Sequence, residues 1–302
     1  DKYLTKALPS LPPALLHKYI RLKRIKLSGK RVEKDYRLQE GDTLQLYIND
    51  EFFAAPDPEE QWKKVTPRLD IVYEDEHILL IDKKPGMVVH SDDKQESGTL
   101  IDHVKAHLIA KGEYDPSKEQ SFAPALCNRI DRNTGGIVIA AKNAETLRII
   151  NEKIRDREID KRYLCITLGA PKPAKGSIRC FMVKDEKRKE MKVYDRPVPE
   201  GKTAITHYET LEVRGELALV EVGLETGRTH QIRASFAHVG HPLLGDGKYG
   251  RGEVNRRYNE TRQALYSYKL TFDFPTDAGI LNYLKGRSFE AENVPFVGRY
   301  FK

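Results

Sequence analysis

Short apolar runs separated by polar turns make up most of the chain after residue 67. Runs of about four to eight apolar or β-branched residues bounded by turn residues predict strands. Helical periodicity is clearest over residues 143–157, where Leu147, Ile150 and Ile154 recur on one face and Asn143 is a suitable N-cap. Strands joined by hairpins, with helices inserted between them, predict a mixed, largely antiparallel sheet in an α+β domain. The expected strands are Leu69–Tyr73, Ile78–Ile81, Ile137–Ala141, Tyr163–Leu168, Ala204–Leu211 and Leu217–Val222.

The first 50 residues predict a small unit of their own. A helix can begin at Pro12-Pro13, because proline suits the first helical turn and apolar residues follow at helical spacing up to Ile20. A hairpin follows, and the strand that returns from it bends near Gly41. The first strand of the hairpin is expected near Ile25–Leu27, the turn at Ser28-Gly29-Lys30 and the return over Leu38–Ile48.

Residues 51–67 separate this unit from the rest of the chain. The segment contains Ala54-Ala55-Pro56-Asp57-Pro58 and ends in Pro67, a composition typical of an extended linker. The expected organisation is an N-terminal domain over residues 1–50, a linker over 51–67 and a second domain over 68–302. With 302 residues and 39% hydrophobic content, the chain can bury a core in each domain.

Positive charge is concentrated at the N-terminus. Residues 1–50 hold 11 Lys and Arg against 6 Asp and Glu, whereas the rest holds 41 against 39. The dense run Arg21–Lys26 suits contact with phosphates, and each neutralised phosphate steepens the salt dependence of binding by about 0.7 to 0.9 log units. The alternative is a solvated, charged helix face without a ligand. The residues expected to contact phosphates here are Lys18, Arg21, Lys23, Arg24, Lys26, Lys30 and Arg31.

Other features narrow the class of protein. No apolar run approaches the roughly 20 residues of a membrane span, and the N-terminus has no signal-peptide pattern, so a cytoplasmic protein without membrane contact is expected. Cys127, Cys165 and Cys180 are odd in number and widely spaced, which argues against a disulfide framework and a structural zinc site. We expect them to be reduced packing residues.

The segment Leu126–Val138 contains the most informative chemistry of the chain. Gly135-Gly136 permits backbone conformations closed to other residues, and the apolar run after it predicts a buried strand. Asp131 therefore lies on a bend beside a rigid strand. Arg129 and Arg132 would lower its pKa and keep it an anion that can act as nucleophile or base. The alternative is an Asp that caps a turn and pairs with a surface Arg.

A second motif reads Gly227-Arg228-Thr229-His230-Gln231-Ile232-Arg233 and is followed by His238, Gly240-His241-Pro242 and Gly245–Gly250. Together with the Asp131 segment, it resembles the signatures of the RluA-type pseudouridine synthases. In that family one signature carries a catalytic aspartate and the other supplies an arginine that pairs with it. Further similar segments are Lys83–His90, Lys161–Cys165 and Ala204–Tyr208, so the resemblance covers nearly the whole chain.

The resemblance implies that uridine in RNA is converted to pseudouridine without a cofactor or metal. Asp131 would be the nucleophile or base, Arg233 would pair with it, and Tyr163 would lie against the target base as a candidate for the final proton removal. A Tyr on a strand is otherwise more often a packing residue. The buried target nucleotide would have to be taken from a loop or flipped, at a cost of a few kcal/mol. Residues implied to contact the substrate are Arg129, Thr134, Arg228, His230 and Gln231.

One position departs from the family pattern, since Asn128 stands where a histidine is usual. It rules out a ring nitrogen for proton transfer there. The N-terminal unit resembles the small αL RNA-binding module that many of these enzymes share with a ribosomal protein. The similarity starts abruptly at Asp1–Leu4, and we expect a first strand and an initiator Met to precede it.

Several other interpretations are open to tests. Gly245–Gly250 fits a Gly-x-Gly-x-x-Gly pattern, but it does not follow a strand in a βαβ unit as a dinucleotide site requires. His230, His238, His241 and Asp246 do not have the spacing of known metal sites. A non-catalytic ribosome-binding or assembly factor and a carboxylate-dependent hydrolase of nucleosides or glycosides are the alternative functions, although such hydrolases need paired carboxylates. We expect a monomer that acts on large-subunit ribosomal RNA rather than on transfer RNA.

Overall fold

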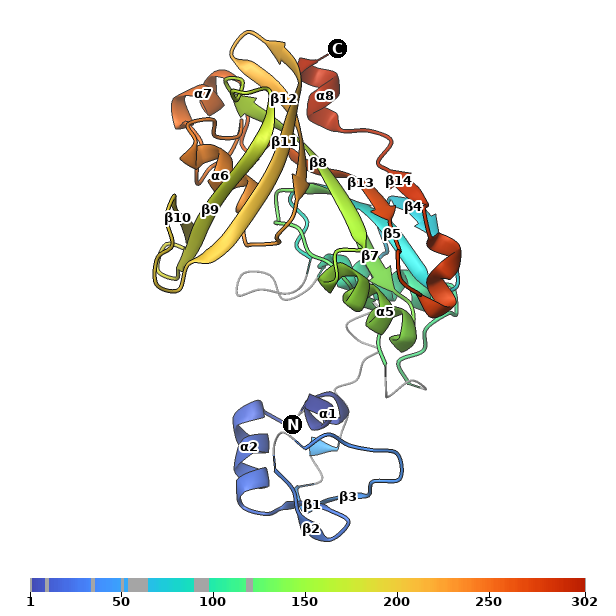
Figure 1. Ribbon diagram of the computed structural model, residues 1–302. Coiled ribbons are helices and arrows are strands. Elements are labelled where there is room, and N and C mark those ends of the chain that lie inside the picture. The colour runs from blue at the N-terminus through green and yellow to red at the C-terminus, as the bar shows by residue number, and fades with distance from the viewer. Residues whose placement is uncertain are drawn as a thin grey trace. The chain divides into compact units, whose positions relative to one another are not determined.

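The computed structural model describes residues 2–8, 11–33, 36–49, 52–53, 65–89, 98–117 and 122–301. The chain divides into two compact units, one made of Asp1–Thr66 and Lys105–Ala123, the other of Pro67–Val104 and Pro124–Lys302 (Figure 1). Residues 51 and 54–64 of the expected linker lie outside the described residues. In the described part of the chain, no helix has the length and apolar character needed to cross a bilayer.

The first unit contains a three-stranded antiparallel sheet beside two helices. The predicted helix and hairpin are confirmed, with Leu16 and Ile25 fully buried in the core between them. The return strand is shorter than predicted and pairs with the first strand through Ile25 and Leu46. The elements are α1 (Lys2–Ala7), α2 (Pro13–Arg21), β1 (Ile25–Leu27), β2 (Lys30–Arg31) and β3 (Leu44–Leu46), in the sheet order β2-β1-β3.

The second unit is built on an 11-stranded sheet with the order β10-β9-β11-β12-β8-β13-β7-β5-β4, with β14 paired to β13 and β6 to β7. β13 and β7 run parallel, and the other pairs are antiparallel, so the predicted mixed α+β architecture is confirmed. The strands are β4 (Ile71–Glu74), β5 (Ile78–Lys83), β6 (Ala125–Leu126), β7 (Gly135–Ala141), β8 (Ile159–Leu168), β9 (Lys175–Asp185), β10 (Glu190–Tyr194), β11 (Lys202–Arg214), β12 (Leu217–Leu224), β13 (Leu265–Phe272) and β14 (Ser288–Glu290).

Five strands of this sheet, namely β6, β9, β10, β13 and β14, were not predicted. In β13 a bulge between Ser267 and Lys269 interrupts the alternation of buried and exposed residues, so the period of two is lost. The sequence of β9 does contain the alternating pattern of a strand, since Ile178, Cys180 and Met182 are buried at alternate positions.

The helices of the second unit cover different parts of the sheet. The helix predicted over residues 143–157 is α5, and the Asn143 side chain caps it by accepting a hydrogen bond from the Thr146 N–H at 2.9 Å. Figure 1 shows α5 beside β7, and α6 and α7 beside the half of the sheet that contains β9 and β11. The helical elements are α5 (Ala144–Arg155), α6 (Gln231–His238), α7 (Gly252–Arg257), α8 (Pro295–Tyr300) and the 3₁₀ helix η2 (Gly279–Leu284). The helix α4 (Leu100–Ala110) begins in the second unit and continues into the segment from Lys105 that is assigned to the first.

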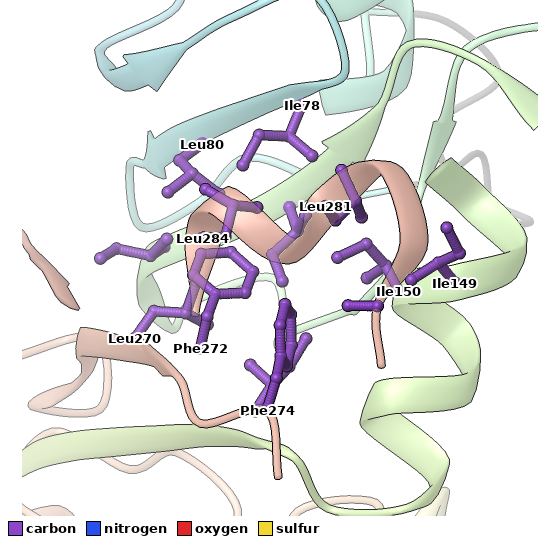
Figure 2. Packing of buried hydrophobic residues seen from close by; sticks show 13 residues of the cluster. Ile78, Leu80, Ile149, Ile150, Leu270, Phe272, Phe274, Leu281 and Leu284 are labelled. Carbon is purple, nitrogen blue, oxygen red and sulfur yellow. The ribbon is translucent and has the colours of Figure 1, made fainter. Parts of the chain in front are cut away.

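The predicted buried face of α5 is confirmed for Ile150 and Ile154 but not for Leu147. Ile149 and Ile150 lie in the core, where they pack near Phe274 and Leu281 (Figure 2), whereas Leu147 is only partly buried. Lys153 is also buried, because its Nζ donates to Glu158 Oε2 at 2.6 Å and is thereby satisfied.

Candidate active site

Asp131 lies in the loop between β6 and β7, and the start of β7 determines where this loop can go. Gly136 has a φ of +114°, and a Cβ at this position would lie 2.2 Å from the Ser267 carbonyl oxygen of β13. Glycine is therefore required for the close parallel pairing of β7 with β13, as the sequence predicted for this bend. The Asp131 carbonyl accepts the Thr134 N–H at 3.0 Å, which closes a tight turn ahead of the strand.

A buried lysine on β5 holds the same loop from the other side. Lys83 Nζ donates to the carbonyl oxygens of Lys84, Met87 and Arg132 at 3.2, 3.0 and 3.0 Å, and the lysine is 1% exposed. Burial lowers the pKa of Lys83 to about 8, although the negative charge of Asp131 acts in the opposite direction. The role of Lys83 was not predicted from the sequence. The clue in the sequence is that Lys83 continues a strand that begins with an apolar run, because a lysine at such a buried position requires buried hydrogen-bond partners.

Arg233 brings the second motif to Asp131. Its Nη1 donates to Asp131 Oδ2 at 2.8 Å, and its Nε and Nη2 donate to Asp246 Oδ2 and Oδ1 at 2.7 and 2.9 Å. The side chains of Arg233 and Asp246 are 7% and 0% exposed, whereas that of Asp131 is 28% exposed. A two-pronged contact with a buried carboxylate fixes the plane of the guanidinium. Asp131 is thus held by a rigid arginine and still reaches solvent.

Asp246 holds Arg233 in place, a role that was not predicted from the sequence. It lies in the Gly245–Gly250 loop, which was considered as a dinucleotide or metal site, and its Oδ1 also accepts the N–H groups of Lys248 and Tyr249 at 2.8 and 3.0 Å. Burial alone would raise the pKa of Asp246, but the hydrogen bonds and charge of Arg233 outweigh it and hold this pKa below its ordinary value.

The two oxygens of the Asp131 carboxylate have different surroundings. Oδ2 accepts from Arg233 and lies 3.8 Å from His230 Nε2. Oδ1 has no hydrogen-bond partner among the residues that the structure describes. The expected flanking arginines are arranged differently from the prediction, since Arg129 and Arg132 are both exposed and Arg132 Nε lies 3.4 Å from the Gly86 carbonyl oxygen. The short ion pair of Asp131 therefore comes from α6 and not from its sequence neighbours.

Tyr163 on β8 is buried close to this carboxylate. It packs in a cluster with Ile130 and Ile232, the sequence neighbours of Asp131 and Arg233. Burial raises the pKa of Tyr163 to about 12, and the charge of Asp131 acts in the same direction. The phenol is protonated at neutral pH. This state suits packing against a nucleobase better than removal of a proton by the tyrosine.

Two residues that the resemblance assigned to substrate contact are occupied within the protein. Gln231 Oε1 accepts from Arg228 N and Thr226 Oγ1, and its Nε2 donates to the Ile205 carbonyl and Thr206 Oγ1. Thr134 is 2% exposed. The geometry thus suits Gln231 and Thr134 to holding the two loops in place.

Arg228 is exposed and is anchored through Nε to the Thr203 carbonyl at 3.0 Å. His230 has a left-handed backbone, with φ +50° and ψ +23°, immediately before α6. Asn128, which replaces the usual histidine, has a backbone role. Its Oδ1 accepts the Ile139 N–H at 2.8 Å, so it extends the pairing at the edge of β7.

The seven basic residues expected to contact RNA, Lys18, Arg21, Lys23, Arg24, Lys26, Lys30 and Arg31, lie at the end of α2 and along the β1–β2 hairpin. All are exposed except Lys26, which is partly buried. Arg24 lies over the Tyr19 ring at 5.4 Å and Lys26 over the Tyr47 ring at 5.2 Å, while Arg31 pairs with Glu33 at 3.1 Å. Tyr47 is 57% exposed, so one aromatic side chain stands in solvent beside the basic run.

Comparison with known proteins identifies the class to which this fold and site belong. The family described as RNA pseudouridylate synthase matches residues 77–238. A solved human protein, RNA pseudouridylate synthase domain containing 4, has the same fold, with a TM-score of 0.59, 21% identity and coverage of 75% of this chain and 89% of that one.

Curated relatives cover almost the full length of the chain. An RNA pseudouridine synthase of Chlorobaculum parvum is 33% identical over 94% of this chain and 88% of the relative. YlyB of Bacillus subtilis, also named as an RNA pseudouridine synthase, is 30% identical over 91% and 86%. Ribosomal large subunit pseudouridine synthase C of Buchnera aphidicola is 28% identical over 91% and 85%. The chain belongs to the RNA pseudouridine synthase family, and its activity is that of an isomerase that modifies RNA.

Proposed function

We propose that Asp131 is the reacting carboxylate and that the substrate is large-subunit ribosomal RNA. The observation that carries the first part is the asymmetry of the carboxylate. Arg233, itself fixed by buried Asp246, holds Oδ2, while Oδ1 is left without a partner among the described residues. A rigid anion with one open oxygen is suited to act as nucleophile or base, because little reorganisation is needed when it reacts.

The reaction exchanges one bond of the nucleotide for another. The N1–C1′ glycosidic bond breaks, the C5–C1′ bond forms, carbon 5 loses its proton and N1 gains one, so no oxidant or energy source is needed. Asp131 serves this isomerisation by adding to carbon 6 of uracil or by acting at the sugar, through attack or proton removal. Neutral Tyr163 would pack against the base during the rotation that brings carbon 5 to C1′.

The RNA target is proposed from two observations. The Buchnera relative is named for the large ribosomal subunit. The basic run of the first unit provides closely spaced cations and the exposed ring of Tyr47, a combination suited to phosphates and to a stacked base. We infer that this unit is an αL-type RNA-binding module that supplies affinity, while Arg129 and Arg228 contact the substrate near Asp131.

The direct test uses purified protein and unmodified bacterial ribosomal RNA without added metal or nucleotide. We expect new pseudouridines in large-subunit RNA, mapped by carbodiimide adducts and reverse-transcription stops. Transfer RNA transcripts serve as the comparison substrate. Stops confined to transfer RNA would contradict the ribosomal target, and tight binding without stops on either RNA would favour the non-catalytic assembly role.

The role of the basic run is tested with the triple variant Lys23→Gln, Arg24→Gln and Lys26→Gln. We expect the Kd for RNA at 0.15 M salt to rise about 10- to 100-fold and the slope of log Kd against log salt to fall by about 2 to 3, with kcat little changed. The control triple variant replaces Arg148, Arg155 and Lys175 by Gln, which removes the same charge from exposed side chains that pair with carboxylates. Equal effects of the two triple variants would refute a specific role for the N-terminal residues.

A further inference from the structure

Tyr249, in the Gly245–Gly250 loop, touches three groups of the Asp131 site. Its ring centroid lies 5.3 Å from Arg233 Cζ, and its backbone N–H donates to Asp246 Oδ1 at 3.0 Å. Its hydroxyl lies 2.9 Å from His230 Nδ1, with the two rings nearly perpendicular at 75°. Both groups that face Asp131 Oδ2, the guanidinium and the imidazole, are therefore in contact with this one tyrosine.

The hydrogen bonds of the Tyr249 hydroxyl determine which nitrogen of His230 carries the proton. The hydroxyl oxygen accepts the Met191 N–H of β10 at 2.8 Å. Its own proton then has one acceptor within reach among the described residues, His230 Nδ1. A neutral imidazole that accepts at Nδ1 carries its proton on Nε2. The Nε2–H thus faces Asp131 Oδ2 across 3.8 Å.

His230 is held neutral in this position. Burial lowers its pKa, and the charges that face the ring are of both signs, with Asp131 and Asp246 opposed by Arg233 and Lys248. The left-handed backbone of residue 230, an uncommon conformation for a non-glycine residue, places the ring at the start of α6. A neutral N–H donor polarises the carboxylate without adding a full positive charge beside it.

We propose that Tyr249 and His230 are positioning residues for Asp131. Tyr249 sets the His230 tautomer, and the Nε2–H of His230 joins Arg233 in directing Oδ2, so that Oδ1 is the oxygen that reacts. The inference rests on the proposed role of Asp131. Through Met191 it also ties the β9–β10 hairpin to the site, because the same hydroxyl holds a backbone N–H of β10.

The tautomer is measured directly by ¹⁵N-detected NMR of histidine-labelled protein at pH 7. The chain has nine histidines, and the ring signals absent from His230→Gln identify His230. We expect a neutral ring with the proton on Nε2 in the wild type, and a mixed or charged ring in Tyr249→Phe. A proton on Nδ1, a charged ring in the wild type, or an unchanged ring in Tyr249→Phe would overturn the proposal.

Kinetics separate positioning from general stability. We expect Tyr249→Phe to lower kcat about 10-fold with KM within about threefold, because one hydrogen bond to an orienting group is lost. His230→Gln should have a kcat about 10-fold higher than His230→Leu, because the amide N–H of Gln can replace Nε2–H. The two variants carry the same backbone strain, so strain does not contribute to this difference. Tyr194→Phe on β10 is the control for hydroxyl removal. Equal kcat values for the Gln and Leu variants would contradict the proposal.

Parallel measurement of Asp131→Asn separates this inference from the proposed function. If Asp131→Asn is inactive and the His230 ring has its proton on Nδ1, the positioning role alone fails. If Asp131→Asn remains active, the proposed function fails, whatever the state of the ring.

Discussion

Replacing Asp131 by Asn is expected to abolish pseudouridine formation while RNA binding is retained. The amide is nearly the same size as the carboxylate but is a poor nucleophile and base, so kcat should fall by at least about 10⁴-fold. Arg233 keeps its two contacts with Asp246, which preserves the local fold. Release of tritium from RNA labelled at carbon 5 of uridine measures the rate, because the reaction removes that hydrogen.

The control for Asp131→Asn is Asp195→Asn, in which the side chain is 84% exposed and pairs with His238. Filter binding or fluorescence anisotropy should give a Kd for RNA within about threefold of wild type for both variants. Substantial tritium release by Asp131→Asn would show that another group performs the reaction. Release of free uracil by the wild type would instead favour the hydrolase alternative.

Replacing Arg233 by Met is expected to reduce both stability and activity. The change leaves Asp246, whose side chain is 0% exposed, as a buried carboxylate without its cation, which should lower the free energy of unfolding by about 3–5 kcal/mol. It also removes the donor that orients Asp131 Oδ2, and we expect kcat to fall about 10³-fold in the folded fraction. Urea unfolding and the tritium assay, performed on the same preparation, measure the two effects separately.

The double variant Arg233→Met with Asp246→Asn is the matched control. The amide oxygen introduced by Asp246→Asn can still accept the N–H groups of Lys248 and Tyr249, and the side chain carries no buried charge. We therefore expect much of the stability to return without the activity. Recovery of activity in the double variant, or a loss of stability below about 1 kcal/mol in the single one, would contradict this assignment.

The effect of Arg233→Met should also depend on pH. In the wild type the Asp246 pKa lies below its ordinary value, so its stabilising contribution is present above about pH 4 and is lost as the pH falls through the lowered pKa. In Arg233→Met, burial without the arginine should raise this pKa. As the pH falls towards about 4, protonation of Asp246 should then remove the buried unpaired charge and reduce the destabilisation of the variant. The difference in unfolding free energy between the two proteins is therefore expected to narrow in acid.

The residues that we propose for the reaction could be located in the sequence because their motifs are local. Asp131 and Arg233 each lie in a continuous sequence motif. The two consecutive glycines at Gly135-Gly136 indicate a bend whose backbone conformation is closed to other residues. The supporting residues could not be predicted in the same way. Lys83 is held by carbonyls that include that of Arg132, 49 residues further along the chain. Asp246 is held by Arg233, which is only 13 residues away but lies in a different element, so neither contact can be read from a single motif.

By itself the sequence determined the α+β class, most of the strands, the capped helix α5 and the two motifs to which we assign the chemistry, since period, caps and glycine requirements are local properties. The family resemblance of the sequence already implied that Arg233 pairs with Asp131, and the structure contains this ion pair. Only the tertiary structure decided that Arg129 and Arg132 are exposed, and that Gln231 and Thr134 hold loops. The physical reason is that ion pairing and hydrogen-bond saturation depend on which groups are buried together, and burial is set by the packing of the whole sheet.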